Sequence, residues 1–247
     1  MTDQVLPIEG QPLSQGARVL DTFIAPTKTF TDILRSTSWW LPFLLMVIVS
    51  FASAYAIDKN VGFDRVAEQQ VEQSPSQADR LAQLTPDARA QQMHGRAVGT
   101  KYSTYASGVF ILLITAIFAF LNWAGLNFGL GAKTTFGQNF AVAMYSSLPR
   151  LFIGLLNIVF LYAGVNTENF DLNNPVGTNI GYYLTDSPHW IRAAMGFFDL
   201  FGIWTLVLSV IGCAIIARKS YQQAAYVVVG WFLFFMVLTA GLVAAFS

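Results

Sequence analysis

The chain has 247 residues, of which 54% are hydrophobic and only 11% are charged, against about 25% charged in an ordinary soluble protein. Its 14 basic and 14 acidic residues cancel, and the sequence shows no concentrated basic face of the kind that nucleic-acid binding needs. The one cysteine, Cys213, excludes an intrachain disulfide and a metal cluster built on cysteines. Composition therefore favours an integral membrane protein over a soluble domain.

Residues 1–38 are predicted to form a cytoplasmic tail and an amphipathic helix. The first 13 residues are polar and contain Pro7, Gly10 and Pro12, which indicates a loose tail. Apolar residues then recur at helical spacing over residues 17–34, and Pro26 is expected to kink this helix because proline cannot donate the helical hydrogen bond. Two placements fit equally well: along the membrane surface, or packed on the bundle as a short cytosolic helix.

Five apolar segments occupy residues 39–247, each near or above the roughly 20 residues that a helix needs to cross a bilayer core. They are Trp39–Ile57, Thr104–Leu130, Phe140–Ala163, Ala193–Ala217 and Ala224–Phe246. This pattern predicts an all-α, polytopic membrane helix bundle with five transmembrane helices. The third segment is expected to kink or split at residues 146–150, which contain Pro149.

The polar residues 58–103 separate the first two segments and carry six acidic and six basic side chains. Ser74-Pro75 and Thr85-Pro86 indicate two helix starts, because proline suits the first helical position after a capping residue. We therefore expect an extra-membrane helical excursion between spans one and two. His94 has no evident partner there and is interpreted as solvated.

Basic residues in short loops set the expected topology. One side would hold Arg18, Lys28, Arg35, Lys133, Arg218 and Lys219, and the other the loop 165–189, which lacks Lys and Arg. This places the N-terminus in the cytoplasm and the C-terminus outside, in a cell membrane. The basic residues of the excursion count against this orientation.

Two charged residues fall inside apolar segments, where charges are costly and tend to mark function. They are Asp199 in the fourth segment and Arg150 in the third, and the long stem of arginine would allow an ion pair between them. With Asn122, Asn157 and Trp204 they form a candidate intramembrane polar cluster. A structural seam is the favoured interpretation, because no second acid or histidine completes a relay. The alternative is a site for an ion, a proton or a lipid headgroup.

Small residues in two spans indicate close helix packing. Gly125 and Gly129 form a G-x-x-x-G pair in the second span, and Gly202 and Gly212 lie in the fourth. Glycine at such positions lets a neighbouring helix approach closely.

The sequence shows no metalloprotease, P-loop, nucleophile-elbow or dinucleotide-binding motif. We therefore predict no catalytic residue, no metal site and no cofactor. The favoured function is a non-enzymatic scaffold, interaction or membrane-organising protein. The alternative is a small-solute or ion transporter or channel that uses the Asp/Arg/Asn cluster. A third possibility is a membrane-shaping protein whose residues 17–34 wedge into one leaflet. Expected partners are the lipid bilayer and proteins of unknown identity, and a homo-oligomer stays open.

Several segments resemble the Yip family of five-span membrane proteins, most closely its bacterial branch. They are Phe23-Ile24-Ala25-Pro26, Trp39-Trp40-Leu41-Pro42-Phe43, Tyr145-Ser146-Ser147-Leu148-Pro149 and Asp199-Leu200-Phe201-Gly202-Ile203-Trp204. The resemblance implies a cytoplasmic N-terminus and, for the bacterial branch, the inner membrane. Eukaryotic members bind Rab-type GTPases in vesicle traffic, but their Asp-Leu-Tyr-Gly-Pro motif is absent here. For bacterial members the resemblance implies no settled activity.

Overall fold

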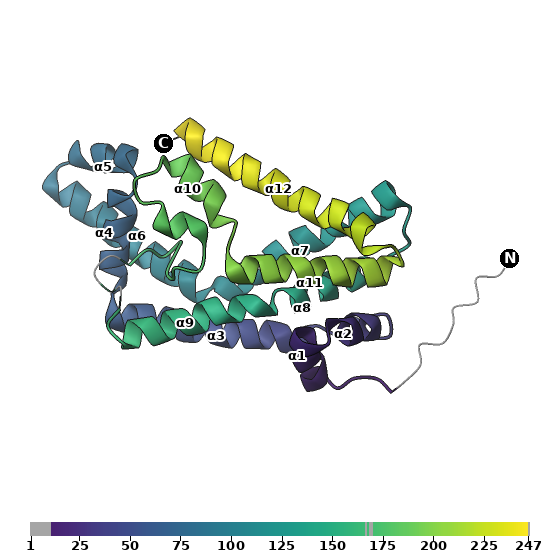
Figure 1. The fold of residues 1–247 in the computed structure, drawn as a ribbon. Helices are drawn as coiled ribbons and strands as arrows, with labels where there is room; N and C mark the ends of the chain where they lie inside the picture. The colour runs from purple at the N-terminus through teal and green to yellow at the C-terminus, as the bar shows by residue number, and fades with distance from the viewer. Residues whose placement is uncertain (1–10, 166, 168–169, 247) are drawn as a thin grey trace. The chain divides into compact units, whose positions relative to one another are not determined.

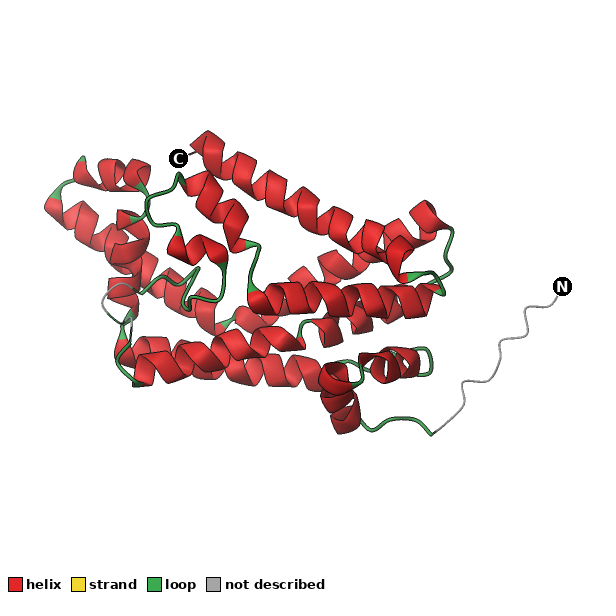
Figure 2. Ribbon diagram, viewed as in Figure 1, coloured by secondary structure: helices red, strands yellow, loops and turns green. Residues whose placement is uncertain are grey.

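The structure is a computed structural model that describes residues 11–165, 167 and 170–246. Regular structure in these ranges is helical throughout (Figure 2), and an isolated antiparallel bridge joins Asn179 to Asp199. This confirms the all-α prediction. Most of the predicted loose tail, residues 1–10, and the C-terminal Ser247 lie outside the described residues.

In the described part of the chain, five helical stretches are long and apolar enough to cross a membrane. They are Trp40–Asn60, Ser107–Gly129, Phe136–Tyr162, Leu200–Ala217 and Tyr221–Ala245. The third stretch consists of α8 (Phe136–Ser146) and α9 (Leu151–Tyr162), joined by the 3-10 turn η2 (Leu148–Arg150). The predicted break near Pro149 is therefore confirmed, together with the polytopic helix bundle.

The fourth apolar segment is not one helix, so the prediction of a continuous span over Ala193–Ala217 is wrong. The chain forms α10 (His189–Gly196), breaks at residues 197–199, and starts α11 (Leu200–Ala217). Asp199 causes the break, since its Oδ1 accepts a hydrogen bond of 2.8 Å from the Gly202 N–H. Aspartate favours such an N-cap over a helix interior because its short side chain competes for backbone donors.

The chain divides into two compact units. The first unit comprises Met1–Leu44, Leu113–Pro149 and Trp204–Trp231, and the second comprises Leu45–Leu112, Arg150–Ile203 and Phe232–Ser247. The helices α3 (Trp40–Asn60), α7 (Ser107–Ala124), α11 and α12 (Tyr221–Phe246) contribute residues to both. The boundary that the sequence suggests at residue 38 stays a prediction.

In the first unit, α1 (Gln15–Ile24) and α2 (Pro26–Ile33) form a helical hairpin that packs against α8 (Figure 1). The helices part at Ala25-Pro26, which confirms the predicted kink. Phe30 and Ile33 of α2 are fully buried, so this helix belongs to the unit's core. For α2 the structure therefore favours packing on the bundle over lying on the membrane surface.

Polar side chains also shape the end of the second span. After α7 the helix widens into the π-helical turn η1 (Gly125–Gly129), and Gly131 turns the chain at a φ of +62°. Asn127 holds this turn closed, because its Oδ1 accepts from the Thr134 N–H at 2.8 Å and its Nδ2 donates to the Thr134 carbonyl at 2.9 Å. The next helix, α8, therefore starts at a fixed position.

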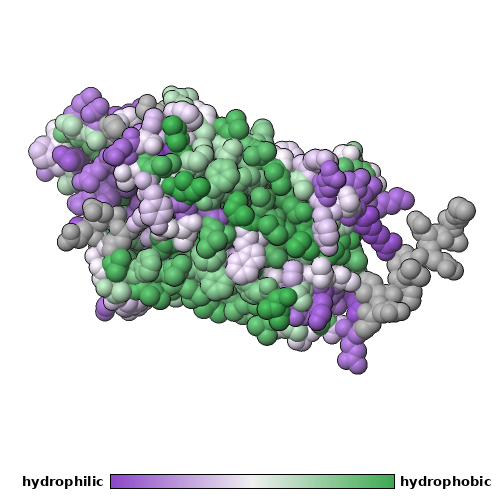
Figure 3. Space-filling view, viewed as in Figure 1, coloured by the Kyte–Doolittle hydropathy of each residue, from purple (hydrophilic) through white to green (hydrophobic). Residues whose placement is uncertain are grey.

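In the second unit, α4 (Phe63–Glu72), α5 (Pro75–Ala82) and α6 (Pro86–Tyr105) form the predicted helical excursion. The helix α4 packs against α5 and α6, and Figure 3 shows hydrophilic residues gathered over these helices. Both helix starts predicted from prolines are confirmed, and the Thr85 hydroxyl accepts from the Ala88 N–H. The excursion leads into α7 with only Ala106 between the two helices.

Apolar and polar contacts attach the excursion to the end of α3. A buried apolar cluster joins α3, α4 and α9 and consists of Ala56, Ile57, Phe63, Val66, Leu161 and Phe170. Asp58 accepts from Lys101 at 2.8 Å and from the Tyr105 hydroxyl at 3.3 Å. The hydrogen bond that Lys101 donates to Asp58 raises the pKa of Lys101, and burial together with the Asp58 charge raises the pKa of Tyr105. Both groups therefore keep the protonated forms that donate to Asp58.

Candidate functional site

A buried ion pair joins the two helices of the N-terminal hairpin. Arg18 of α1 and Asp32 of α2 are only 2% and 4% exposed, and the Arg18 Nε lies 2.7 Å from an Asp32 carboxylate oxygen. Charged side chains are rarely buried to this degree unless they are paired and hydrogen-bonded. The pair is therefore a specific feature of this hairpin and not part of a solvated helix face.

The remaining donors of Arg18 bind backbone carbonyls. One terminal nitrogen donates to the carbonyls of Ser36 and Ser38, at 2.9 and 3.3 Å, and the other to the Asp32 carbonyl at 3.4 Å. The same carboxylate oxygen of Asp32 also accepts from the Leu13 N–H at 3.2 Å. Arg18 thus connects α1, α2 and the residues that lead into α3.

The local sequence explains how the pair forms. The Ser14 hydroxyl caps α1, and Pro26 occupies the first turn of α2, where its missing N–H costs no helical bond. The reversal at Ala25 brings the Thr29 hydroxyl within 2.9 Å of the Arg18 carbonyl, which also accepts from the Thr22 hydroxyl at 2.7 Å. Polar residues at helical spacing on both helices therefore face one another inside the hairpin.

Residues of α8 and α11 attach the hairpin to the rest of the first unit. The Tyr145 hydroxyl of α8 donates to Gln15 Oε1 at 2.9 Å. The rings of Phe23 and Trp204 meet edge to face with centroids 5.5 Å apart. At Gly212 of α11, an added Cβ would lie 2.5 Å from a Val142 methyl group and 2.9 Å from the Phe30 ring, so only glycine permits this approach.

The outer side of the hairpin differs from the inner side. Leu20 and Ile24 are 66% and 80% exposed, and Thr27 and Lys28 are also exposed. Within the described ranges no three His, Cys, Asp or Glu side chains lie together in a way that could hold a metal ion. The hairpin thus exposes apolar and polar side chains on its outer side, while its charged pair is enclosed on the inner side.

The members of the predicted polar cluster fall in different units. Asn122 and Trp204 belong to the first unit, whereas Arg150, Asn157 and Asp199 belong to the second. Asn122 is 6% exposed on α7, and Trp204 packs on Phe23 as described above.

Asp199 serves as the cap of α11. Besides the Gly202 N–H, its carboxylate accepts the Thr178 hydroxyl, and the Leu200 N–H donates to the Thr178 carbonyl at 3.0 Å. Asp199 therefore fixes the loop before α11 to the start of that helix, and the prediction that it lies inside the fourth spanning helix is wrong.

Arg150 and Asn157 have separate surroundings. Among the residues that the structure describes, Arg150 and Asp199 form no ion pair within 4 Å, although their charges attract each other at longer range. Asn157 is 3% exposed and donates from Nδ2 to the Ser53 hydroxyl at 2.8 Å, which links α9 to α3. The hydrogen bonds to Ser53 and to the Gly202 N–H give Asn157 and Asp199 structural roles.

The four predicted packing glycines also differ. An added Cβ at Gly125 would lie 2.5 Å from a Val227 methyl group, so α12 approaches closely there, as α2 and α8 approach Gly212. At Gly129 nothing lies within 4 Å. The nearest atoms to Gly202 belong to Asp199, its own helix cap, at 3.3 Å. Gly125 and Gly212 are thus the positions at which a side chain would clash.

Replacing Asp199 by alanine is expected to lower the free energy of unfolding by about 1 kcal/mol, because α11 loses its cap. Asparagine at the same position keeps an oxygen acceptor for the Gly202 N–H and should lose less. Equilibrium unfolding of the two variants in detergent checks this order. An equal loss for both variants would show that the charge of Asp199, and not its capping bond, is what matters.

Four residues of this site were not predicted from the sequence as site residues: Arg18, Asp32, Tyr145 and Gln15. A usable signal was present, since Arg18, Thr22, Thr29 and Asp32 follow helical spacing on the two sides of Pro26.

The sequence also matches a known protein family. A family model described as the Yip1 domain matches residues 20–242, which include most of the hairpin and nearly all of the five apolar helices. The comparisons with curated proteins and with solved structures give no match.

Proposed function

Since this chain belongs to the Yip1 domain family and is a multi-pass helical membrane protein, we propose that it acts as a non-enzymatic membrane scaffold. In this proposal the α1–α2 hairpin is the surface that protein partners bind. The five apolar helices hold the hairpin at the membrane and perform no chemistry of their own.

The buried Arg18–Asp32 pair is the observation that carries the proposal. It fixes the hairpin in one conformation, and Phe30 and Tyr145 anchor the hairpin in the first unit. A preformed surface binds a partner without first having to be ordered, which removes an entropic cost of association. Such rigidity suits a docking platform better than a mobile tail.

The proposed orientation places the N-terminus in the cytoplasm and the chain in a cell membrane. The six basic residues that define the cytoplasmic side belong to the first unit: Arg18, Lys28, Arg35, Lys133, Arg218 and Lys219. The loop 165–189, which lacks Lys and Arg, belongs to the second unit. The excess of basic residues in short cytoplasmic loops supports this orientation.

Site-specific photocrosslinking in native membranes tests the scaffold function. A benzophenone side chain at the exposed Thr27 of α2 is expected to give a discrete protein adduct, because Thr27 lies on the proposed binding surface. The same probe at Leu238 of α12, which is exposed on an apolar helix, is the control. The adduct should disappear when Arg18→Ala releases the hairpin. Identical adducts at both positions, or an adduct that survives Arg18→Ala, would contradict the proposal.

The alternative of a transporter rests on Asp199, Arg150 and the two asparagines. The capping role of Asp199 and the Asn157–Ser53 hydrogen bond give this alternative no support. Proteoliposomes containing Asp199→Asn separate the two functions. A solute or ion flux through the wild-type protein that this variant abolishes, with folding intact, would favour the transporter.

A further inference from the structure

We propose that the edge of α1 formed by Leu20 and Ile24 inserts into the lipid leaflet on the hairpin's side of the membrane, and that anionic headgroups of that leaflet hold it there. The inference rests on the docked hairpin of the proposed function and adds a second ligand, the bilayer itself. Four observations in the first unit support it.

The first observation is an apolar edge that no part of the hairpin covers. Leu20 and Ile24 are 66% and 80% exposed, and they lie four residues apart, so both side chains are on the same face of α1. Gly16 continues this face one turn earlier and is also exposed. Large exposed apolar side chains that form one stripe indicate a binding surface for protein or lipid.

The second observation is that α1 cannot rotate about its axis to bury Leu20 and Ile24 against the rest of the first unit. Arg18 and Thr22, on the opposite face of α1, are buried and bonded within the hairpin. Gln15 accepts from Tyr145, and Phe23 packs against Trp204. Rotating α1 to bury Ile24 would break the Arg18–Asp32 pair.

The third observation is the short distance along the chain from the hairpin to the first apolar helix. Only residues 34–39 separate α2 from α3, which limits the connection to about 25 Å at full extension. Arg18 shortens it further by binding the carbonyls of Ser36 and Ser38. Trp40, the first residue of α3, is 53% exposed, and tryptophan prefers the membrane–water boundary. The hairpin therefore lies at the depth where an amphipathic helix inserts its apolar face.

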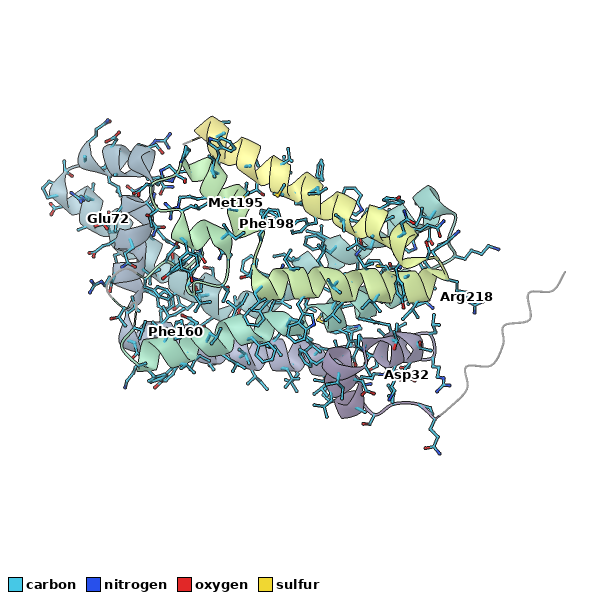
Figure 4. All side chains as sticks on the ribbon, in the orientation of Figure 1. Asp32, Glu72, Phe160, Met195, Phe198 and Arg218 are labelled. Atoms are coloured by element: carbon cyan, nitrogen blue, oxygen red, sulfur yellow. The ribbon has the colours of Figure 1, made fainter. Side chains whose placement is uncertain are left out.

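The fourth observation is the charge of this unit, which selects anionic lipids. The described part of the first unit carries six basic side chains but only two acidic ones, Asp21 and Asp32. Figure 4 labels Asp32 and Arg218, which lie toward the same end of this unit. Basic residues next to a membrane attract acidic headgroups, so the field of the unit draws the hairpin onto an anionic leaflet.

Spin-label accessibility in full-length protein tests the inference. Ile24→Cys, in a Cys213→Ser background, carries the label in nanodiscs of phosphatidylcholine alone or mixed with phosphatidylglycerol. Oxygen partitions into the bilayer and a neutral nickel chelate stays in water, so their collision rates report depth. Val237→Cys on α12 is the reference for lipid, and Ser220→Cys, an exposed polar position, is the reference for water.

The label at position 24 should collide with oxygen as the Val237→Cys label does and should be protected from nickel, and phosphatidylglycerol should increase this protection. Nickel collisions equal to those at position 220 would overturn the inference. Low collision rates with both reagents would also overturn it, because the edge would then be covered by protein. A wild-type unfolding midpoint for the labelled protein shows that the hairpin is docked, so a negative result here leaves the scaffold proposal standing.

Discussion

Arg18→Ala is expected to lower the free energy of unfolding by about 3–5 kcal/mol, the cost of removing one partner from a buried ion pair. The variant leaves the Asp32 carboxylate, only 4% exposed, without its main counter-charge. It also leaves the Ser36 and Ser38 carbonyls without the guanidinium that they accept from. Equilibrium unfolding of the full-length protein in detergent, followed by circular dichroism, measures the loss.

Two further variants test whether the loss of stability in Arg18→Ala comes from the buried ion pair. Lys28→Ala removes an exposed charge from the same hairpin and should change the free energy of unfolding by about 0.5 kcal/mol or less. Replacing both partners, with Arg18→Met and Asp32→Leu, should recover most of the loss, because no charge is then left buried. A loss for Arg18→Ala no larger than that for Lys28→Ala would show that the pair does not hold the hairpin.

Gly212→Ala is expected to destabilise the protein by about 1–3 kcal/mol, the usual cost of overpacking a filled core. The new methyl group would lie 2.5 Å from a Val142 methyl group and 2.9 Å from the Phe30 ring, both of which are buried. Neither neighbour can move aside easily, since valine is stiff at χ1 and Phe30 is fully enclosed. Either α2 or α8 must therefore shift away from α11, and unfolding in detergent measures the cost.

Gly129→Ala is the matched control, because no atom lies within 4 Å of the position that its Cβ would take. Alanine also loses less backbone entropy than glycine on folding, so this variant should be neutral or more stable by roughly 0.5–1 kcal/mol. Equal destabilisation by Gly212→Ala and Gly129→Ala would mean that a general sensitivity of the helices, and not close packing on the hairpin, explains the loss.

Features set by short stretches of sequence could be predicted. Five apolar runs predict five spanning helices, because each run is long and apolar enough to cross a bilayer core. Proline residues predict where helices start, because proline lacks the N–H that a helix interior needs. The structure has such starts at Pro26, Pro75 and Pro86.

Features that depend on a distant partner could not be predicted. Asp199 interrupts the fourth segment through its capping bond to the Gly202 N–H, although apolar residues flank it on both sides in the sequence. Arg18 resembles an ordinary charge of an amphipathic helix until the hairpin closes and brings Asp32, fourteen residues later, into contact. Asn157 likewise donates to Ser53, which lies 104 residues away in the sequence, only once α9 packs beside α3.

Backbone hydrogen exchange of the full-length protein in nanodiscs tests most directly whether the α1–α2 hairpin is a fixed part of the first unit. The amides of both hairpin helices should be protected to the same level as those of α8, because buried residues and the Arg18–Asp32 pair prevent the hairpin from opening on its own. Exchange of the hairpin amides at the rate of an unstructured peptide, with α8 still protected, would contradict a docked platform.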